Sequence, residues 1–150
     1  MLRVHRWFPV FAALALVACG GSDGPTDPGN GGNDPPGETR AIKDTPSFAA
    51  DVQEIFDRRG CSAGSCHGAA AAANLDLRAS ASFAALVNVA SFQDGNEVRV
   101  IPGNAQNSYL VEKVEGRQTV GSTMPPNGSP LDQIDRTNLR NWIDNGAENN

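Results

Sequence analysis

The chain has 150 residues, of which 39% are hydrophobic and only 6% are aromatic, with 16 Gly and 10 Pro. This thin supply of apolar side chains suffices for one small domain and excludes a larger multidomain architecture. The formal net charge is −5 and the only adjacent basic pair is Arg58 and Arg59, which excludes a basic stripe able to follow a nucleic acid.

Residues 1–18 have the features of a secretion signal. Two arginines precede the apolar run FPVFAALALVA, which is too short to span a bilayer as a permanent helix. The run ends in LVACG at residues 16–20, which resembles the lipobox of bacterial lipoproteins. The resemblance implies cleavage before Cys19 and attachment of lipid to its thiol; the alternative is an ordinary signal peptide with a chance cysteine. We expect an exported protein anchored by lipid to the cell envelope, in the periplasm or at the outer membrane.

The segment 19–44 predicts a lipidated cysteine followed by a tether. From Gly20 to about Arg40 it is rich in Gly, Pro, Asp and Asn, and these residues leave almost nothing to bury. The folded domain is therefore expected at 45–150. Without the two arginines of the signal, 10 basic residues face 17 acidic ones, so an electropositive protein partner is expected and nucleic acid is not.

The start of the domain predicts a helix. Thr45 supplies a capping hydroxyl before Pro46, which tolerates the first helical turn, and Gly60 marks the end. Its apolar face consists of Phe48, Val52, Ile55 and Phe56. A second helix is expected from Ser80 or Ser82, with Phe83, Leu86 and Val87 as its apolar residues.

Two further helices are expected in the second half of the domain. Ser108 is predicted to cap a short helix that Gly116 ends, after an extended segment at 98–101. Asp132 and Asp135 predict the start of a last helix, which ends at Gly146. Its apolar patch is Leu139, Trp142 and Ile143. No segment reads as a convincing sheet, so the expected fold class is all-α.

The segment CSAGSCHG at 61–68 carries the chemistry. Cys61 and Cys66 can form thioether bonds with the two vinyl groups of haem, and His67 then lies where its ring nitrogen reaches the iron. The usual attachment motif has two residues between the cysteines, whereas this chain has four. The alternative reading of the pair is a structural disulfide, which an oxidising compartment favours when no haem is attached.

The number of histidines and methionines in the chain identifies a candidate for the second iron ligand. Once the signal is removed, His67 is the only histidine and Met124 the only methionine, so a second histidine ligand within the chain is excluded. Met124 precedes Pro125 and Pro126, whose rings stiffen a loop that can hold a thioether against iron. The alternative for a lone methionine is a core or surface residue without chemical function.

From Ser47 to Ala147 the order of motifs resembles the small class I cytochrome c domains of bacterial lipoproteins. The matching pieces are SFAADVQEIFDRRGC, CHG, NLDLRAS, VIPGNAQNSYLVEKVEG, MPP and LRNWIDNGA. The resemblance implies three to five short helices around one haem c, attached at Cys61 and Cys66, with His67 as proximal and Met124 as distal iron ligand. It also implies that the first and last helices pack across each other, with Phe56 and Trp142 as candidates for the contact.

The resemblance further suggests residues of the haem pocket. The segment NLDLR lies near the haem in this family, so Leu75 and Leu77 are expected to line the pocket and Arg78 to meet a haem propionate. The expected function is electron transfer to redox protein partners and not enzymatic turnover. The alternatives are a haem-free, disulfide-stapled envelope lipoprotein that acts as an interaction module, and a five-coordinate haem sensor or peroxidase-like protein.

Overall fold

The computed structural model describes residues 40–126 and 128–150, and in these residues it is helical without strands. The predicted all-α class is confirmed. The α-helices are α1 (Gln53–Arg58), α2 (Ser82–Leu86), α3 (Tyr109–Glu115) and α4 (Gln133–Asp144). A π-helical turn, η1 (Phe48–Val52), leads into α1, and the short 3-10 turns are η2 (Ala72–Asn74) and η3 (Ala105–Asn107). Extended pairing is limited to two isolated bridges, Val87 with Val100 and Ala90 with Val98.

The first helix begins later than the sequence predicted. Ser47 is the capping residue, because its hydroxyl accepts a hydrogen bond from the Ala50 amide at 3.2 Å, and its own amide donates to the Asp51 carboxylate at 2.8 Å. Thr45 is therefore not the cap. Gly60, with a φ of +69°, follows the helix as predicted.

The second and third helices occur where they were expected. α2 starts at Ser82 and ends before Asn88, which has a φ of +57°. Gly116 ends α3 in a left-handed conformation, as predicted. Ser108 precedes α3, but its hydroxyl donates to the Asn104 carbonyl and accepts from the Ile101 amide, so it does not cap the helix.

The last helix is capped as the sequence predicted. The Asp132 carboxylate accepts a hydrogen bond from the Asp135 amide at 3.0 Å, which satisfies a free N–H of the first turn. The apolar patch of α4, Leu139, Trp142 and Ile143, is at most 1% exposed and forms the centre of the core.

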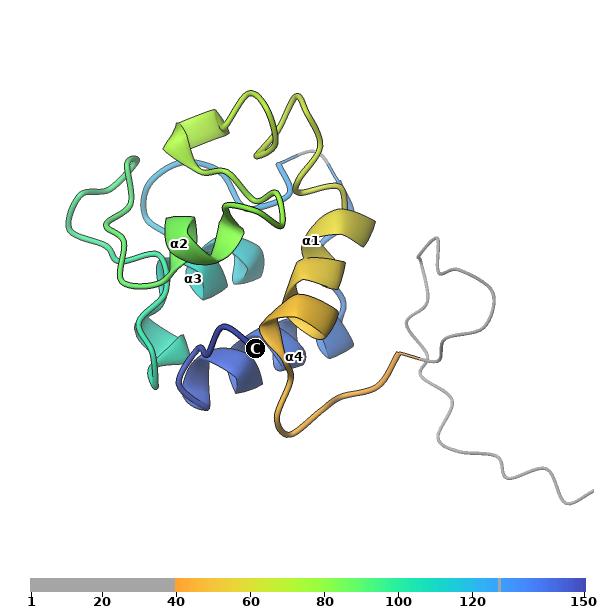
Figure 1. The fold of residues 1–150 in the computed structure, drawn as a ribbon. Helices are drawn as coiled ribbons and strands as arrows, with labels where there is room; N and C mark the ends of the chain where they lie inside the picture. The colour runs from red at the N-terminus through yellow and green to blue at the C-terminus, as the bar shows by residue number, and fades with distance from the viewer. Residues whose placement is uncertain (1–39, 127) are drawn as a thin grey trace, which may run out of the picture.

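The first and last helices lie against each other, and the C-terminus lies beside them (Figure 1). The aromatic contact is made by Phe48, whose ring centroid is 5.2 Å from that of Trp142 and 5.2 Å from that of Phe83. Phe56 is buried in the same core. Asn150 closes the arrangement, because its carbonyl accepts from the Ala49 amide at 2.9 Å and its side chain accepts from the Phe48 amide at 2.8 Å.

Residues 40–44 are bound to α4. Arg40 pairs with Asp132 at 2.7 Å, Asn138 exchanges hydrogen bonds with Ala41 and Lys43, and Asn145 donates to the Asp44 carbonyl. The sequence assigned these five residues to the tether, but their hydrogen bonds make them part of the packed domain.

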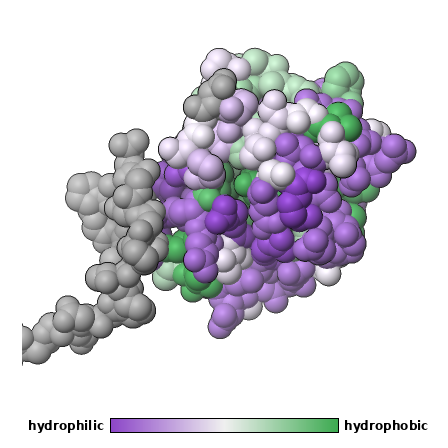
Figure 2. Space-filling view, turned by 180° about the vertical axis from the view of Figure 1, so that it is seen from behind, coloured by the Kyte–Doolittle hydropathy of each residue, from purple (hydrophilic) through white to green (hydrophobic). Residues whose placement is uncertain are grey.

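The predicted signal peptide, Cys19 and the tether up to residue 39 lie outside the described residues. None of the helices in the described part of the chain is both long and apolar enough to cross a membrane. The face turned away from the viewer in Figure 1 is mostly hydrophilic, as Figure 2 shows.

Candidate cofactor site

The loop that carries both cysteines is folded onto the end of α1. The Cys61 amide donates to the Phe56 carbonyl at 2.8 Å across Gly60, which ends the helix and turns the chain into the loop. The His67 amide then donates back to the Cys61 carbonyl at 3.0 Å, and the Cys66 amide donates to the Ala63 carbonyl at 2.9 Å. These backbone bonds close the four-residue gap into compact turns, so the gap does not separate His67 from Cys61.

Gly68 is a close-packed point of this loop. A Cβ atom at this position would lie 2.3 Å from the Ser62 carbonyl oxygen and 2.7 Å from that of Ala63. Both neighbours are backbone atoms, which cannot move aside as a flexible side chain does. The Gly that follows His67 is therefore required by the return of the loop on itself.

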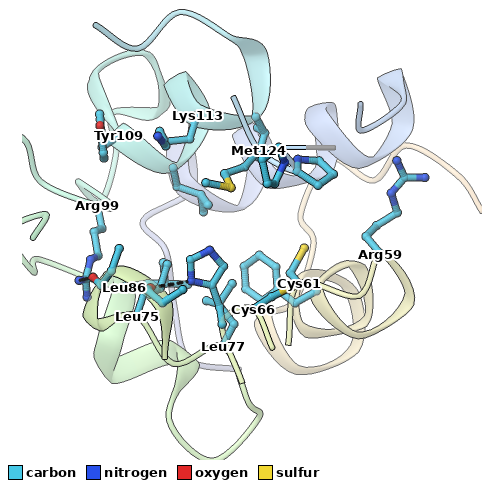
Figure 3. A pocket seen from close by; sticks show the side chains of 18 of the residues that line it. Arg59, Cys61, Cys66, Leu75, Leu77, Leu86, Arg99, Tyr109, Lys113 and Met124 are labelled. Carbon is cyan, nitrogen blue, oxygen red and sulfur yellow. Dashed lines mark hydrogen bonds between the residues drawn. The ribbon is translucent and has the colours of Figure 1, made fainter. Parts of the chain in front are cut away.

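His67 is oriented by a hydrogen bond between its Nδ1 atom and the Ala72 carbonyl oxygen, at 2.9 Å (dashed line in Figure 3). Because a carbonyl only accepts hydrogen bonds, Nδ1 carries the hydrogen of the neutral ring and Nε2 keeps its lone pair. This is the arrangement by which proteins fix the tautomer of a metal-ligating histidine. The half-buried His67 thus has a ring nitrogen available as a ligand.

A cavity of about 350 Å³ lies beside His67. This volume is within the range of roughly 300–1,000 Å³ that is usual for cofactor and small-molecule sites. Its walls are mainly apolar, and Cys61, Cys66, His67 and Met124 all line it. The four candidate residues of the sequence are thus brought to one cavity, although Met124 is 57 positions from His67 in the chain.

Met124 lies across the cavity from Cys61 and Cys66 (Figure 3). Its amide donates to the Lys113 carbonyl at 2.8 Å, which attaches the loop to α3. The rings of Pro125 and Pro126 continue the same wall. The half-buried Met124 side chain is therefore presented to the cavity from the side opposite the cysteines.

The two cysteines are free thiols in different surroundings. Cys61 is half-buried, and burial raises the pKa of its thiol to about 11. Cys66 is exposed. No disulfide joins them.

Of the three residues expected to complete the pocket, the two leucines line the cavity and Arg78 does not. Leu77 is 3% exposed and Leu75 is partly buried against the same core. Arg78 is exposed and pairs with Asp76 at 2.6 Å. The side-chain hydrogen bonds from Arg78 lower the pKa of Asp76 to about 2. The expected role of Arg78 is therefore not supported by its position.

Three basic residues of the cavity, Arg59, Arg99 and Lys113, were not predicted from the sequence. Arg99 and Lys113 are each 7% exposed. Tyr109 lines the same region. No sequence signal identified Arg99, because in an extended segment it points to the face opposite its apolar neighbours Val98 and Val100 and would be expected to be exposed. Lys113 lies in the third helix among apolar residues and carries no clear signal either.

The residues present fit a covalently held haem. Two thiols, one imidazole with a free Nε2 and one thioether border a single, mainly apolar cavity. Haem attachment and ligation use these four groups. Within residues 40–126 and 128–150 no three His, Cys, Asp or Glu side chains gather as a metal-binding cluster.

Comparison of the chain with protein-family models, with curated proteins and with solved structures finds no match. The arrangement of the cavity is therefore the basis for any functional conclusion.

Proposed function

We propose that this chain is an exported, lipid-anchored c-type cytochrome that carries electrons through one haem. Cys61 and Cys66 would hold the haem through thioether bonds, and His67 and Met124 would ligate its iron. One observation carries the proposal: His67 Nδ1 is bound to the Ala72 carbonyl, which leaves Nε2 free at a cavity that Met124 lines from the far side. The fold expected with it is a small class I cytochrome c-like domain.

The bound haem would supply an iron that changes between the ferrous and ferric states. The residues of the chain determine what that iron is used for. With an imidazole from His67 and a thioether from Met124 both bound, the iron would have no position open to a substrate, which favours electron transfer over enzymatic turnover. A methionine ligand favours the ferrous state more than a second histidine does, so the reduction potential is expected above that of bis-His haems.

The surroundings of the site support a carrier. Leu77, Leu86 and Leu139 are at most 3% exposed and give the cavity an apolar wall. A dry, rigid pocket raises the reduction potential and limits rearrangement during electron transfer. The acidic balance of the chain, with 17 acidic and 12 basic residues, favours an electropositive redox partner.

Substitution of Met124 tests the ligand set. The full chain is produced in a host that attaches haem to c-type cytochromes, as the unmutated protein and as Met124→Ala. The unmutated ferric protein is expected to show the weak far-red band of methionine ligation, and its ferrous form is expected to bind little carbon monoxide. In Met124→Ala the band is lost and carbon monoxide binds readily.

Thr119→Ala is the matched control, because Thr119 is an exposed residue of the same connection between α3 and α4. It is expected to retain the spectrum of the unmutated protein. Ready binding of carbon monoxide by the unmutated ferrous protein would contradict Met124 ligation and favour a five-coordinate haem protein. A colourless product would contradict the proposal as a whole.

A further inference from the structure

Arg99 and Lys113 are two buried cations without an acidic partner among the described residues. The Arg99 guanidinium donates only to carbonyls, of Ala85 at 2.8 Å, Asn74 at 3.0 Å and Ala73 at 3.2 Å. By contrast, Arg58 and Arg140 each pair with a carboxylate at 2.6 Å. Burial alone lowers the pKa of Arg99, with no opposing contribution from a carboxylate.

Lys113 is in a similar position. Its ammonium group is 3.1 Å from the Gln93 side-chain oxygen and 3.3 Å from the Val120 carbonyl, and it lies 5.5 Å from the centre of the Tyr109 ring. These partners are polar or aromatic but carry no charge. Burial lowers the pKa of this group as well. Buried charges are usually paired, because removing them from water is unfavourable.

Both cations are on one side of the cavity. Figure 3 shows Arg99 and Lys113, with Tyr109, on the side away from Cys61 and Arg59. Arg59 differs from them, because its guanidinium donates to the Ser129 and Pro130 carbonyls and lies 3.9 Å from the Asp135 carboxylate. The cavity therefore has a thiol end and a separate end with two buried cations that pair with no carboxylate among the described residues.

We propose that Arg99 and Lys113 form an anion-binding end of the cavity that takes the carboxylates of its ligand. The inference rests on the proposed function, in which those carboxylates are the two haem propionates. Haem carries its vinyl groups and its propionates on opposite halves of the ring. With the thiols at one end and the two cations at the other, the ring is held in one orientation, and each carboxylate meets a cation that otherwise lacks one.

The test compares two ligands that share one ring and differ in whether their two carboxylates are free or esterified. The full chain is produced without the haem-attachment apparatus and titrated with mesohaemin, in which ethyl groups replace the vinyl groups so that no thioether forms. It is titrated in parallel with mesohaemin dimethyl ester, and binding is followed by porphyrin absorbance. Because a hydrogen bond between charged groups is strong, mesohaemin is expected to bind at least about tenfold more tightly than the ester.

Substitutions test whether the two cations cause the difference between the affinities for mesohaemin and for its ester. Arg99→Gln and Lys113→Gln are each expected to weaken mesohaemin binding by about tenfold and to leave binding of the ester unchanged. Arg78→Gln is the matched control, since Arg78 is an exposed cation outside the cavity, and it is expected to change neither affinity. Arg99→Lys, which keeps the charge, is expected to restore part of the difference.

The outcomes separate this inference from the proposed function. Equal affinity of the unmutated chain for mesohaemin and its ester overturns the anion-binding end, and it does so even if a variant fails to fold. If the chain is produced in a host that attaches haem and retains haem after denaturation, but the two ligands bind equally, only the anion-binding end is contradicted. If the chain binds neither ligand and retains no haem on maturation, both proposals fall.

Discussion

At the scale of single residues, the two cysteines of the site differ most in accessibility. Cys61 is tied by its amide to the end of α1 and is half-buried, whereas Cys66 is exposed at the surface of the loop. Burial raises the pKa of the Cys61 thiol to about 11. At pH 8 only about one Cys61 in a thousand is then in the reactive thiolate form.

We expect the haem-free chain to show ordered alkylation. With a small excess of iodoacetamide at pH 8, Cys66 is expected to react at least about tenfold faster than Cys61, since the thiolate is the nucleophile. Peptide mass spectrometry after timed quenching measures both rates. Equal rates would mean that Cys61 is not shielded, and Cys66→Ser identifies the slow phase.

Gly68 gives a second residue-scale prediction. Gly68→Ala places a methyl group 2.3 Å from the Ser62 carbonyl oxygen, so the loop must shift. We expect a loss of about 2 kcal/mol in the free energy of unfolding and reduced haem incorporation. Chemical denaturation measures the first quantity. Gly64→Ala is the control, because nothing lies within 4 Å of the added group, and a loss as large as that of Gly68→Ala would contradict the account.

Residue roles were only partly predictable from the sequence. The spacing of CSAGSCHG and the count of histidines and methionines identified four residues that the structure brings to one cavity. The assignment of Arg78 was not supported, because Asp76, two positions earlier, pairs with it at the surface. Arg99 is placed at the cavity because its neighbour Val100 forms an isolated β-bridge with Val87. A single bridge of this kind cannot be predicted from the periodicity of the sequence.

At the scale of elements, a buried carboxylate joins α1 to the start of α4. Asp135 is 1% exposed and pairs with Arg58 at 2.6 Å and with Arg40 at 3.1 Å. Arg58 is the last residue of α1, and the loop with both cysteines follows it directly. The Asp135 pairs therefore fix the point at which the loop with both cysteines leaves the helix.

We expect Asp135→Asn to lower the free energy of unfolding by about 3 kcal/mol, because it removes a buried charge that compensates the half-buried guanidinium groups of Arg40 and Arg58. Urea denaturation at pH 7 is the measurement. Glu148→Gln removes an exposed carboxylate and is expected to change stability by less than about 0.5 kcal/mol. Similar effects of the two substitutions would contradict the role of Asp135.

A second ion pair joins α3 to α4 and responds to pH. Glu115 accepts hydrogen bonds from Arg140 at 2.6 and 2.7 Å, and these bonds, with one from Arg117, lower its pKa to about 2. The folded-state pKa is below the ordinary value of 4.5, so the pair contributes stability above pH 4.5 and loses it as the pH falls toward 2.

The prediction compares Glu115→Gln with the unmutated chain. The variant is expected to be less stable by about 1 kcal/mol at pH 7, and the difference is expected to disappear between about pH 4.5 and pH 2. Thermal unfolding at a series of pH values measures the difference. A difference that stays constant down to pH 2 would show that Glu115 acts through packing and not through its charge.

Helix positions were predictable to different degrees. Asp132 and Gly116 were identified as helix boundaries because their local chemistry, a capping carboxylate and a left-handed turn, acts without long-range contacts. The start of the first helix was placed at Thr45, yet Ser47 caps it and the first turns are π-helical. Asn150 accepts hydrogen bonds from the amides of this turn. A contact between residues about a hundred positions apart cannot be predicted from a local sequence pattern.

At the scale of the whole molecule, the cavity is assembled from segments that are far apart in sequence. The loop after α1 supplies Cys61 and His67, α3 supplies Lys113 and the connection to α4 supplies Met124. The short helices enclose a cavity of about 350 Å³ within a domain of little more than a hundred described residues. A small core of this kind gains stability from a ligand that fills it. The all-α class followed from periodicity, whereas the composition of the cavity depended on how the helices pack.

The central claim is that Cys61 and Cys66 hold one haem covalently. The most direct test is the mass of the full chain after production with a haem-attachment apparatus, denaturation and extraction with acidified acetone. The extracted protein is expected to keep the mass of one haem, neither thiol is expected to react with iodoacetamide, and Cys61→Ser/Cys66→Ser is expected to lose the haem on extraction. An unmutated protein that gives up all its haem, or never contains any, and leaves both thiols reactive or joined as a disulfide would contradict the claim.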